Sequence, residues 1–293
     1  MIRLIGSELF KLRKRLMTRV LLFVLMGILI LIPFLLLAIS NAVGASGIGG
    51  SGDGARINAL LGLSSALPFS FSLMASFGSV LAIILAASSI GNEYNWKTIR
   101  TALISSESRF KFLTAKLISL AILVFIGLLA GVVVSFLTSL VTNALGHYAF
   151  DFSFATGSYV WAQFLQFWRT FFIIVPFSLL GFMMAIVGRS AMPGIATGIG
   201  VYFLEGIITT FMTLAGGWIA KVPFYLMTAN ANAITALNNL PQGFRGGGGG
   251  SGTGTSALEN LPTAGHAFLI LSIYAVIFMF LAYYLFKKRD VTG

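Results

Sequence analysis

The chain has 293 residues, of which 57% are hydrophobic and only 9% charged, and its mean hydropathy is +0.95. Because soluble globular domains carry about 25% charged residues, this composition excludes an ordinary cytosolic enzyme. Nineteen Lys and Arg against eight Asp and Glu give a formal charge of +11. In so apolar a chain, that excess indicates a membrane protein with basic cytoplasmic loops and not a nucleic-acid-binding protein. With no cysteine and two histidines, thiolate nucleophiles and Cys- or His-rich metal sites are excluded, and we expect no metal site.

Residues 1–19 are predicted to form an amphipathic helix that lies in the membrane interface. Four apolar residues share one helical face: Ile5, Leu9, Leu12 and Leu16. Lys11, Lys14 and Arg15 lie on the opposite side. Two interpretations stay open: attraction of the helix to anionic lipid, which sets topology, or a docking surface for a cytoplasmic partner.

Six stretches are long and apolar enough to cross a bilayer, which takes about 20 residues. They lie near 20–40, 67–90, 117–141, 161–187, 194–215 and 267–286. Long unbroken runs are unlike the short alternating strands of a membrane barrel. The predicted fold is therefore all-α, with a single six-helix transmembrane domain over residues 20–293 after the interface helix 1–19.

The distribution of basic residues predicts the orientation. Fifteen Lys and Arg precede the first span, follow the last span or lie in the connections 91–116 and 188–193. Only Arg56, Lys221 and Arg245 fall in the loops of the opposite side, 41–66, 142–160 and 216–266. Since cytoplasmic loops carry the excess of Lys and Arg, both termini are predicted to be cytoplasmic.

Two outward loops are rich in glycine, and neither matches a nucleotide-binding motif. The run Gly246–Gly250 is followed by Ser251 and Gly252, without the Lys-Ser or Lys-Thr that a P-loop needs. We interpret residues 246–252 as a flexible linker, natural or engineered.

The connection 91–116 is much longer than a plain turn between two helices needs to be, and it is dense in charged and aromatic residues. Two short helices are predicted, one over 92–104 and a second that starts from a serine cap near 105–108 and runs into span three. A folded, charged surface of this kind favours a protein partner. This loop and the helix 1–19 are the two predicted cytoplasmic elements.

This stretch resembles the signature of type-2 ATP-binding-cassette (ABC) exporter permeases. In that family a Glu-Tyr pair closes span two, a Thr-(Leu/Ile)-Arg follows, and a Ser-Arg precedes a Lys that opens span three. The matching positions are Glu93, Tyr94, Thr98, Ile99, Arg100, Ser108, Arg109 and Lys116. Lys97 departs from the Gly that often precedes the Thr. The six-span topology and the basic helix before span one are also similar.

The resemblance implies the permease subunit of an exporter in the prokaryotic plasma membrane, paired with a second permease chain, identical or homologous. Two cytoplasmic ABC ATPase subunits would bind ATP and Mg and push on the two cytoplasmic elements. No GxxxxGK[ST] motif occurs, so the chain itself is expected to have no catalytic site, no cofactor and no nucleic-acid partner. The implied ATPase interface consists of Glu93, Tyr94, Thr98, Arg100, Ser108 and Arg109, with Lys11 and Arg15 from the N-terminal helix.

Two ionisable residues fall within predicted spans, where such residues are candidates for function. At 1.5 Å per residue, Arg169 lies about 12 Å from the outer side and Glu205 about 16 Å from the inner side. Both then lie near the outer half, where a pair between them is possible. Arg169 could instead reach the outer surface, and Glu205 could bind backbone groups or line a substrate path.

Two other functions compete with the permease. A secondary transporter or channel would show inverted repeats or broken helices, and it leaves the charged connection 91–116 without a role. A remote alternative is an intramembrane serine protease, which needs a Gly-x-Ser motif in one span and a His in another. The GGSG strings at 49–52 and 249–252 lie in outward loops instead.

Overall fold

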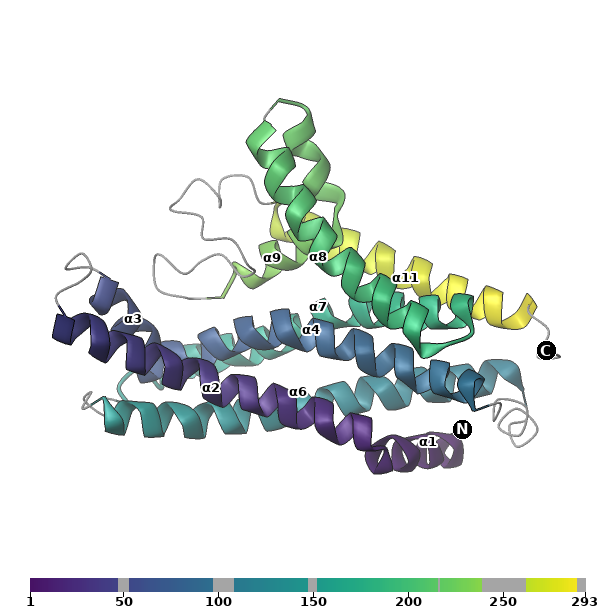
Figure 1. Ribbon diagram of the computed structural model, residues 1–293, viewed down its shortest axis with the longest axis horizontal. Coiled ribbons are helices and arrows are strands. Elements are labelled where there is room, and N and C mark those ends of the chain that lie inside the picture. Colours follow the sequence, from purple (N-terminus) through teal and green to yellow (C-terminus); the bar gives the residue numbers. More distant parts are fainter. Residues whose placement is uncertain (47–52, 97–107, 147–151, 216, 239–261, 289–293) are drawn as a thin grey trace.

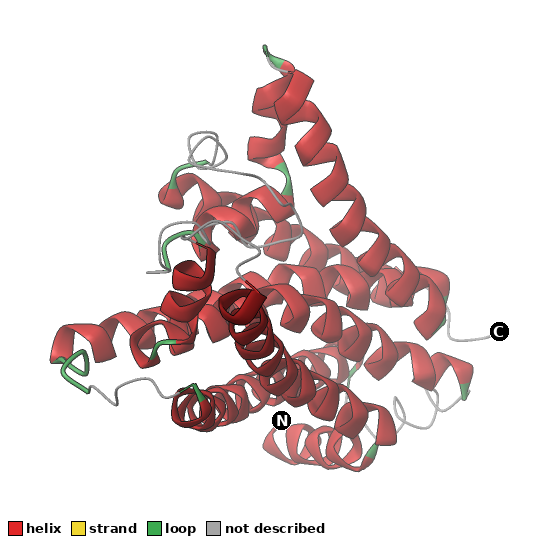
Figure 2. Ribbon diagram, turned by 60° about the vertical axis from the view of Figure 1, so that its left-hand side comes forward, coloured by secondary structure: helices red, strands yellow, loops and turns green. Residues whose placement is uncertain are grey.

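The computed structural model describes residues 1–46, 53–96, 108–146, 152–215, 217–238 and 262–288. Within these ranges the chain is helical and has no strand (Figure 2), which confirms the all-α prediction. The elements in chain order are α1 (Ile2–Lys14), α2 (Leu16–Ser46), α3 (Asp53–Leu61), α4 (Leu63–Asn95), α6 (Arg109–Leu145), α7 (Gly157–Gly188), α8 (Ala191–Ala215), η1 (Ile219–Tyr225), α9 (Met227–Thr235) and α11 (Ala264–Lys288).

Six of these helices are long and apolar enough to cross a membrane: α2, α4, α6, α7, α8 and α11. They contain the six predicted spans, but several extend beyond them. Helix α4 continues to Asn95 and α6 begins at Arg109, because helical hydrogen bonding does not stop where the apolar run stops. The predicted connection 91–116 is therefore helical at both ends. Its centre, residues 97–107, lies outside the described residues, as does most of the predicted helix 92–104.

Helices α4 and α7 form the centre of the bundle (Figure 1). In their most apolar stretches 67% and 61% of residues are buried, against 22% in α2 and α6, 11% in α11 and 6% in α8. Helix α8 approaches the central pair through glycine. A Cβ on Gly194 would lie 2.6 Å from the Gly181 carbonyl oxygen of α7 and 2.8 Å from Ala87 Cβ of α4. Only a residue without a side chain allows this packing.

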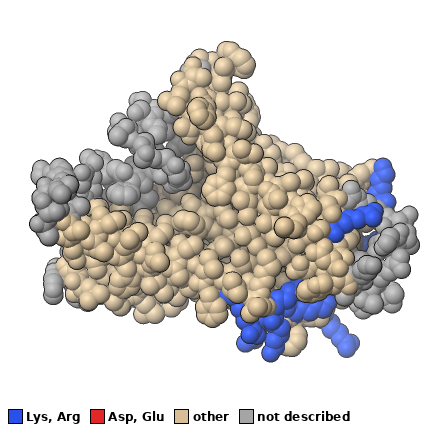
Figure 3. Space-filling view, in the orientation of Figure 1, with Lys and Arg blue, Asp and Glu red and all other residues tan. Residues whose placement is uncertain are grey.

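The N-terminal helix α1 and the carboxyl end of α11 lie at the same end of the molecule (Figure 1). Figure 3 shows that Lys and Arg gather at this end, over α1 and near the carboxyl end of α11. We call it the basic end; it also holds the carboxyl end of α4 and the start of α6. The part of the molecule away from it, which holds α3, η1 and α9, is called the far end. The number of candidate spans agrees with the six that were predicted.

The far end is more structured than predicted. The expected outward loop 41–66 contains α3, and the expected loop 216–266 contains η1 and α9. All of α9 except Asn232 is buried, and it packs against α7, α8 and α11. Sequence patterns missed it because α9 has only nine residues and alternates apolar with polar side chains. The glycine-rich runs 49–52 and 246–252 lie outside the described residues.

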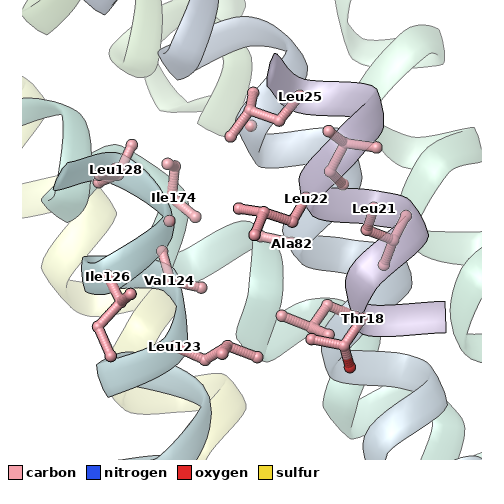
Figure 4. A pocket seen from close by; sticks show the side chains of 14 residues that line it. Thr18, Leu21, Leu22, Leu25, Ala82, Leu123, Val124, Ile126, Leu128 and Ile174 are labelled. Carbon is pink, nitrogen blue, oxygen red and sulfur yellow. The ribbon is translucent and has the colours of Figure 1, made fainter. Parts of the chain in front are cut away.

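An apolar pocket of about 100 Å³ lies between α2, α4 and α6 (Figure 4). Leu22 of α2, Ala82 of α4 and Val124 of α6 are among the side chains that line it. Thr18 is its one polar lining side chain. The pocket therefore offers apolar surface and almost no groups for chemistry.

Candidate functional site

Five charged side chains meet at the basic end, where α1, α4 and α6 come together. They are Glu8, Lys11, Arg15, Glu93 and Lys116, and we call them the basic-end charge cluster. Lys116 is at its centre and is fully buried. Its Nζ lies 2.6 Å from Glu8 Oε2 and 2.7 Å from Glu93 Oε1, so one ammonium bridges two carboxylates from two other helices.

Glu8 is buried because of its place on α1. It lies three residues after Ile5 and four before Leu12, so it shares the inner face of the helix with them. Leu12 is 2% exposed and Glu8 is 3% exposed, and Ser119 of α6 donates a hydrogen bond to the Ile5 carbonyl oxygen. Leu16, predicted on this face, is 76% exposed. The helix ends at Lys14 and Arg15 is extended, which turns Leu16 away.

The ammonium group of Lys116 has all three of its donor positions used. Besides the two carboxylates, Nζ donates to the Ser89 carbonyl oxygen of α4 at 3.3 Å. It also lies 5.2 Å from the centre of the Phe112 ring. An ammonium has three hydrogens to donate, so burial leaves none of them without an acceptor.

Arg15 attaches the break between α1 and α2 to the carboxyl end of α4. Its Nη1 donates to the Ser89 carbonyl oxygen at 3.3 Å, and its Nη2 lies 3.8 Å from Glu93 Oε1. The guanidinium lies 5.4 Å from the centre of the Trp96 ring. Arg15 and Lys116 therefore hold the same carboxylate and the same carbonyl from two directions.

Opposing effects set the ionisation of Glu8. Burial alone would raise the pKa of its carboxyl group, but the charges of Lys116 and Lys11 and their hydrogen bonds outweigh it, and the pKa lies below 4.5. Lys11 Nζ lies 2.7 Å from Glu8 Oε1. The cluster thus contains two acidic and three basic side chains. Within the described residues no group of His, Asp and Glu could hold a metal ion.

The cluster joins α1 to the two helices that flank residues 97–107. Glu93 lies two residues before the end of α4, and Lys116 lies seven residues after the first residue of α6. Removing one partner of a buried ion pair costs about 3–5 kcal/mol. The carboxyl end of α4, the start of α6 and α1 are therefore expected to move as one body.

Three residues of the predicted partner interface lie in the basic-end charge cluster itself. Glu93 is 3% exposed and its carboxylate binds Lys116, so its charge is directed into the protein. Arg15 is mostly buried in the same cluster, whereas Lys11 keeps about half of its side chain exposed. The signature glutamate thus has an internal role in this structure.

The remaining interface residues have different positions. Ser108 caps α6 by accepting a hydrogen bond from the Lys111 backbone N–H at 3.1 Å, which confirms the predicted serine cap. Tyr94 is partly buried against the core. Arg109 donates to the Lys287 carbonyl oxygen of α11 at 3.3 Å. Thr98 and Arg100 lie outside the described residues.

The predicted pair of Arg169 and Glu205 is not formed. Glu205 Oε2 instead accepts hydrogen bonds from the Thr228 backbone N–H at 2.8 Å and from Thr228 Oγ1 at 2.7 Å. Thr228 lies in the first turn of α9, so the carboxylate caps that helix. In the part of the chain that the structure describes, no salt bridge joins Glu205 to Arg169. Equal depth was the only basis for the pair, and depth does not fix which way a helix faces.

Sequence reasoning also missed Glu8. Lys116 was part of the signature, but no partner was expected for it. The available signal was that Glu8 is the only acidic residue among the first 52 residues and lies on the apolar face of α1. An acid in that position needs a cation opposite it.

A family model described as "Protein of unknown function (DUF2705)" matches residues 58–292, from the end of α3 to beyond α11. The chain belongs to the DUF2705 family. In this DUF2705 protein Glu93 and Lys116 lie inside the matched region, whereas Glu8, Lys11 and Arg15 precede it. A curated relative, the uncharacterized protein YhcI of Bacillus subtilis (strain 168), is 26% identical over 228 residues, which cover 73% of this chain. The match spans only 64% of the length of YhcI.

Proposed function

We propose that this DUF2705 protein is the membrane-spanning subunit of an ATP-driven exporter whose ATPase is a separate cytoplasmic chain. The observation that supports this most is the bridge from Glu8 through Lys116 to Glu93. It joins an interface helix to both helices that flank the charged segment 97–107. That segment carries the Thr98–Arg100 part of the signature that resembles type-2 ABC exporter permeases.

The mechanism follows from this connection. A partner that pushes on residues 97–107 would move the end of α4, the start of α6 and α1 together, because all three are held by one buried ammonium. Helix α4 is one of the two central helices, so its displacement reaches the middle of the bundle. The chain would perform no chemistry itself, and ATP and Mg would bind to the partner.

The charge distribution supports the proposed location. Lys and Arg gather at the basic end (Figure 3), and the positive-inside rule assigns such an end to the cytoplasm. We therefore propose a multi-pass protein of the prokaryotic plasma membrane with both termini in the cytoplasm. A second permease chain, identical or homologous, would complete the transporter, with two ATPase subunits beneath it.

Co-purification tests the proposal. The tagged full chain is extracted from its host in a mild detergent, and associated proteins are identified by mass spectrometry. We expect an ATPase with Walker motifs. Reversing the charge with Arg100→Glu is expected to reduce its recovery roughly tenfold, since charge pairs at an interface govern partner choice. Lys221→Glu in η1 makes the same charge change at the far end and serves as the control.

Either of two results would contradict the proposal. Intact protein without any ATPase would favour a self-sufficient secondary transporter or channel. Equal recovery with Arg100→Glu and Lys221→Glu would place the ATPase contact outside residues 97–107, and the cluster would then have no transmission role.

A further inference from the structure

A cationic and aromatic pocket lies at the basic end, between the start of α6 and the end of α11. Its volume is about 500 Å³, and its lining consists of Arg109, Phe110, Phe280, Tyr283, Tyr284, Phe286 and Lys287. Arg109 Nη1 donates to the Lys287 carbonyl oxygen at 3.3 Å, which holds the two basic residues together. No acidic residue lines this pocket in the described ranges.

Stacked rings give the pocket a rigid aromatic wall. Phe110 of α6 stacks on Tyr283 of α11 with ring centres 4.8 Å apart. Phe280 and Tyr284 are nearly parallel at 6.4 Å, and Lys288 Nζ lies 5.8 Å from the centre of the Tyr284 ring. Tyrosines beside basic residues at a helix end are typical of the interface between lipid headgroups and hydrocarbon.

A second, apolar pocket, which we call the apolar groove, adjoins this one along α6. Tyr283 lines both, and the second pocket has a volume of about 270 Å³ and lies between α4, α6, α7 and α11. At this neck the Tyr283 hydroxyl lies 2.7 Å from Thr114 Oγ1. Beyond it the lining is nearly all apolar, and Ala82 and Val124 are shared with the pocket of Figure 4. Charge, aromatic rings and apolar surface therefore follow one another from the basic end inward.

We propose that the two pockets together bind an anionic phospholipid from the leaflet at the basic end. The phosphate would lie between Arg109 and Lys287, and an acyl chain would extend past Tyr283 along α6. The cationic, aromatic and apolar surfaces follow one another in the same order as the anionic headgroup, the interfacial region and the hydrocarbon chain of such a lipid. Basic pockets between membrane helices are known to take anionic headgroups. A free phosphate would leave the apolar groove unused. The proposal does not depend on the exporter function.

Lipid titration with native mass spectrometry tests this site on the purified full chain. Phosphatidylglycerol and phosphatidylcholine of identical acyl chains are added separately in the same detergent. We expect phosphatidylglycerol to bind at least tenfold more tightly. The double variant Arg109→Gln, Lys287→Gln should weaken it roughly thirtyfold, since each cation near an anionic surface contributes about a factor of five. Arg3→Gln with Arg13→Gln removes the same charge from exposed positions of α1 and should leave binding unchanged.

A second variant tests the acyl-chain groove. Ala121 lines the second pocket, and Ala121→Phe should weaken phosphatidylglycerol binding while both cations remain. Equal binding of the two lipids by the wild-type chain would overturn the proposal without any variant. An equal loss of phosphatidylglycerol affinity in the Arg109/Lys287 and Arg3/Arg13 double variants would also overturn it. General attraction between a basic protein and an anionic lipid would then explain the binding. Displacement of phosphatidylglycerol by inorganic phosphate would reduce the site to a phosphate site and refute the groove.

Discussion

The two ends of the molecule hold carboxylates in different ways. At the basic end, Glu8 and Glu93 share the ammonium of Lys116, and three helices are joined by one cation. At the far end, Glu205 accepts two hydrogen bonds from Thr228 and fixes one short helix, α9. The first arrangement depends on charge at every position. The second depends on a helix terminus, whose free N–H groups attract an anion without any cation.

The packing of α8 shows the same contrast. Near the basic end it lies tightly against α4 and α7 at Gly194. Towards the far end it rises away from the bundle (Figure 1), and Phe211 and Leu214 are 68% and 78% exposed. At the basic end α8 is therefore closely packed between two helices, whereas towards the far end it leaves large apolar side chains exposed.

The largest expected effect comes from Lys116→Met, which removes the ion pairs that join α1, α4 and α6 at the basic end. It removes the buried cation that Glu8 and Glu93 share and leaves them only Lys11 and Arg15, which are both partly exposed. We expect the free energy of unfolding to fall by about 3–5 kcal/mol. Detergent-micelle unfolding followed by circular dichroism measures it. Lys14→Met removes an exposed cation of α1 and should cost at most about 0.5 kcal/mol. Similar losses in the two variants would mean that the cluster does not hold the helices together.

A smaller effect is expected at the far end. Glu205→Ala removes the cap of α9 and should cost about 1 kcal/mol. Combined with Thr228→Val, its loss should be clearly non-additive, because the two side chains form one contact. Combined with Arg169→Gln, the losses should add within about 0.5 kcal/mol. If the stability losses were instead non-additive with Arg169→Gln and additive with Thr228→Val, Glu205 would pair with Arg169, as their equal depth suggested.

The smallest effect is the pH dependence contributed by Glu8. Its pKa in the folded protein lies below 4.5, its ordinary value, so its ionised form stabilises the fold above pH 4.5. That contribution is lost as the pH falls through the lowered value. The difference in unfolding free energy between wild type and Glu8→Gln should therefore shrink on acidification below pH 4.5. A difference that stays constant or grows would show that Lys116 and Lys11 do not lower the pKa of Glu8.

The spans were predictable because about 20 consecutive apolar residues have few alternatives to a membrane helix. Helix α9 was not, since its burial comes from its place among α7, α8 and α11 and not from its own hydropathy. The serine cap at Ser108 was readable from local chemistry alone. The partners of Lys116 were not, because Glu8 is 108 residues away along the chain. For the same reason, the depth of Glu205 could be estimated but its partner could not.

That separation has a consequence for biosynthesis. At about 5–20 residues per second, a ribosome takes about 5–20 s to pass from Glu8 to Lys116. During this interval the acid of α1 has no buried cation to meet, so the helix must wait at the membrane surface while α2 and α4 are inserted. The first helix to be translated therefore cannot reach its final place before the start of α6 is made, and the arrival of Lys116 marks the moment when it can dock.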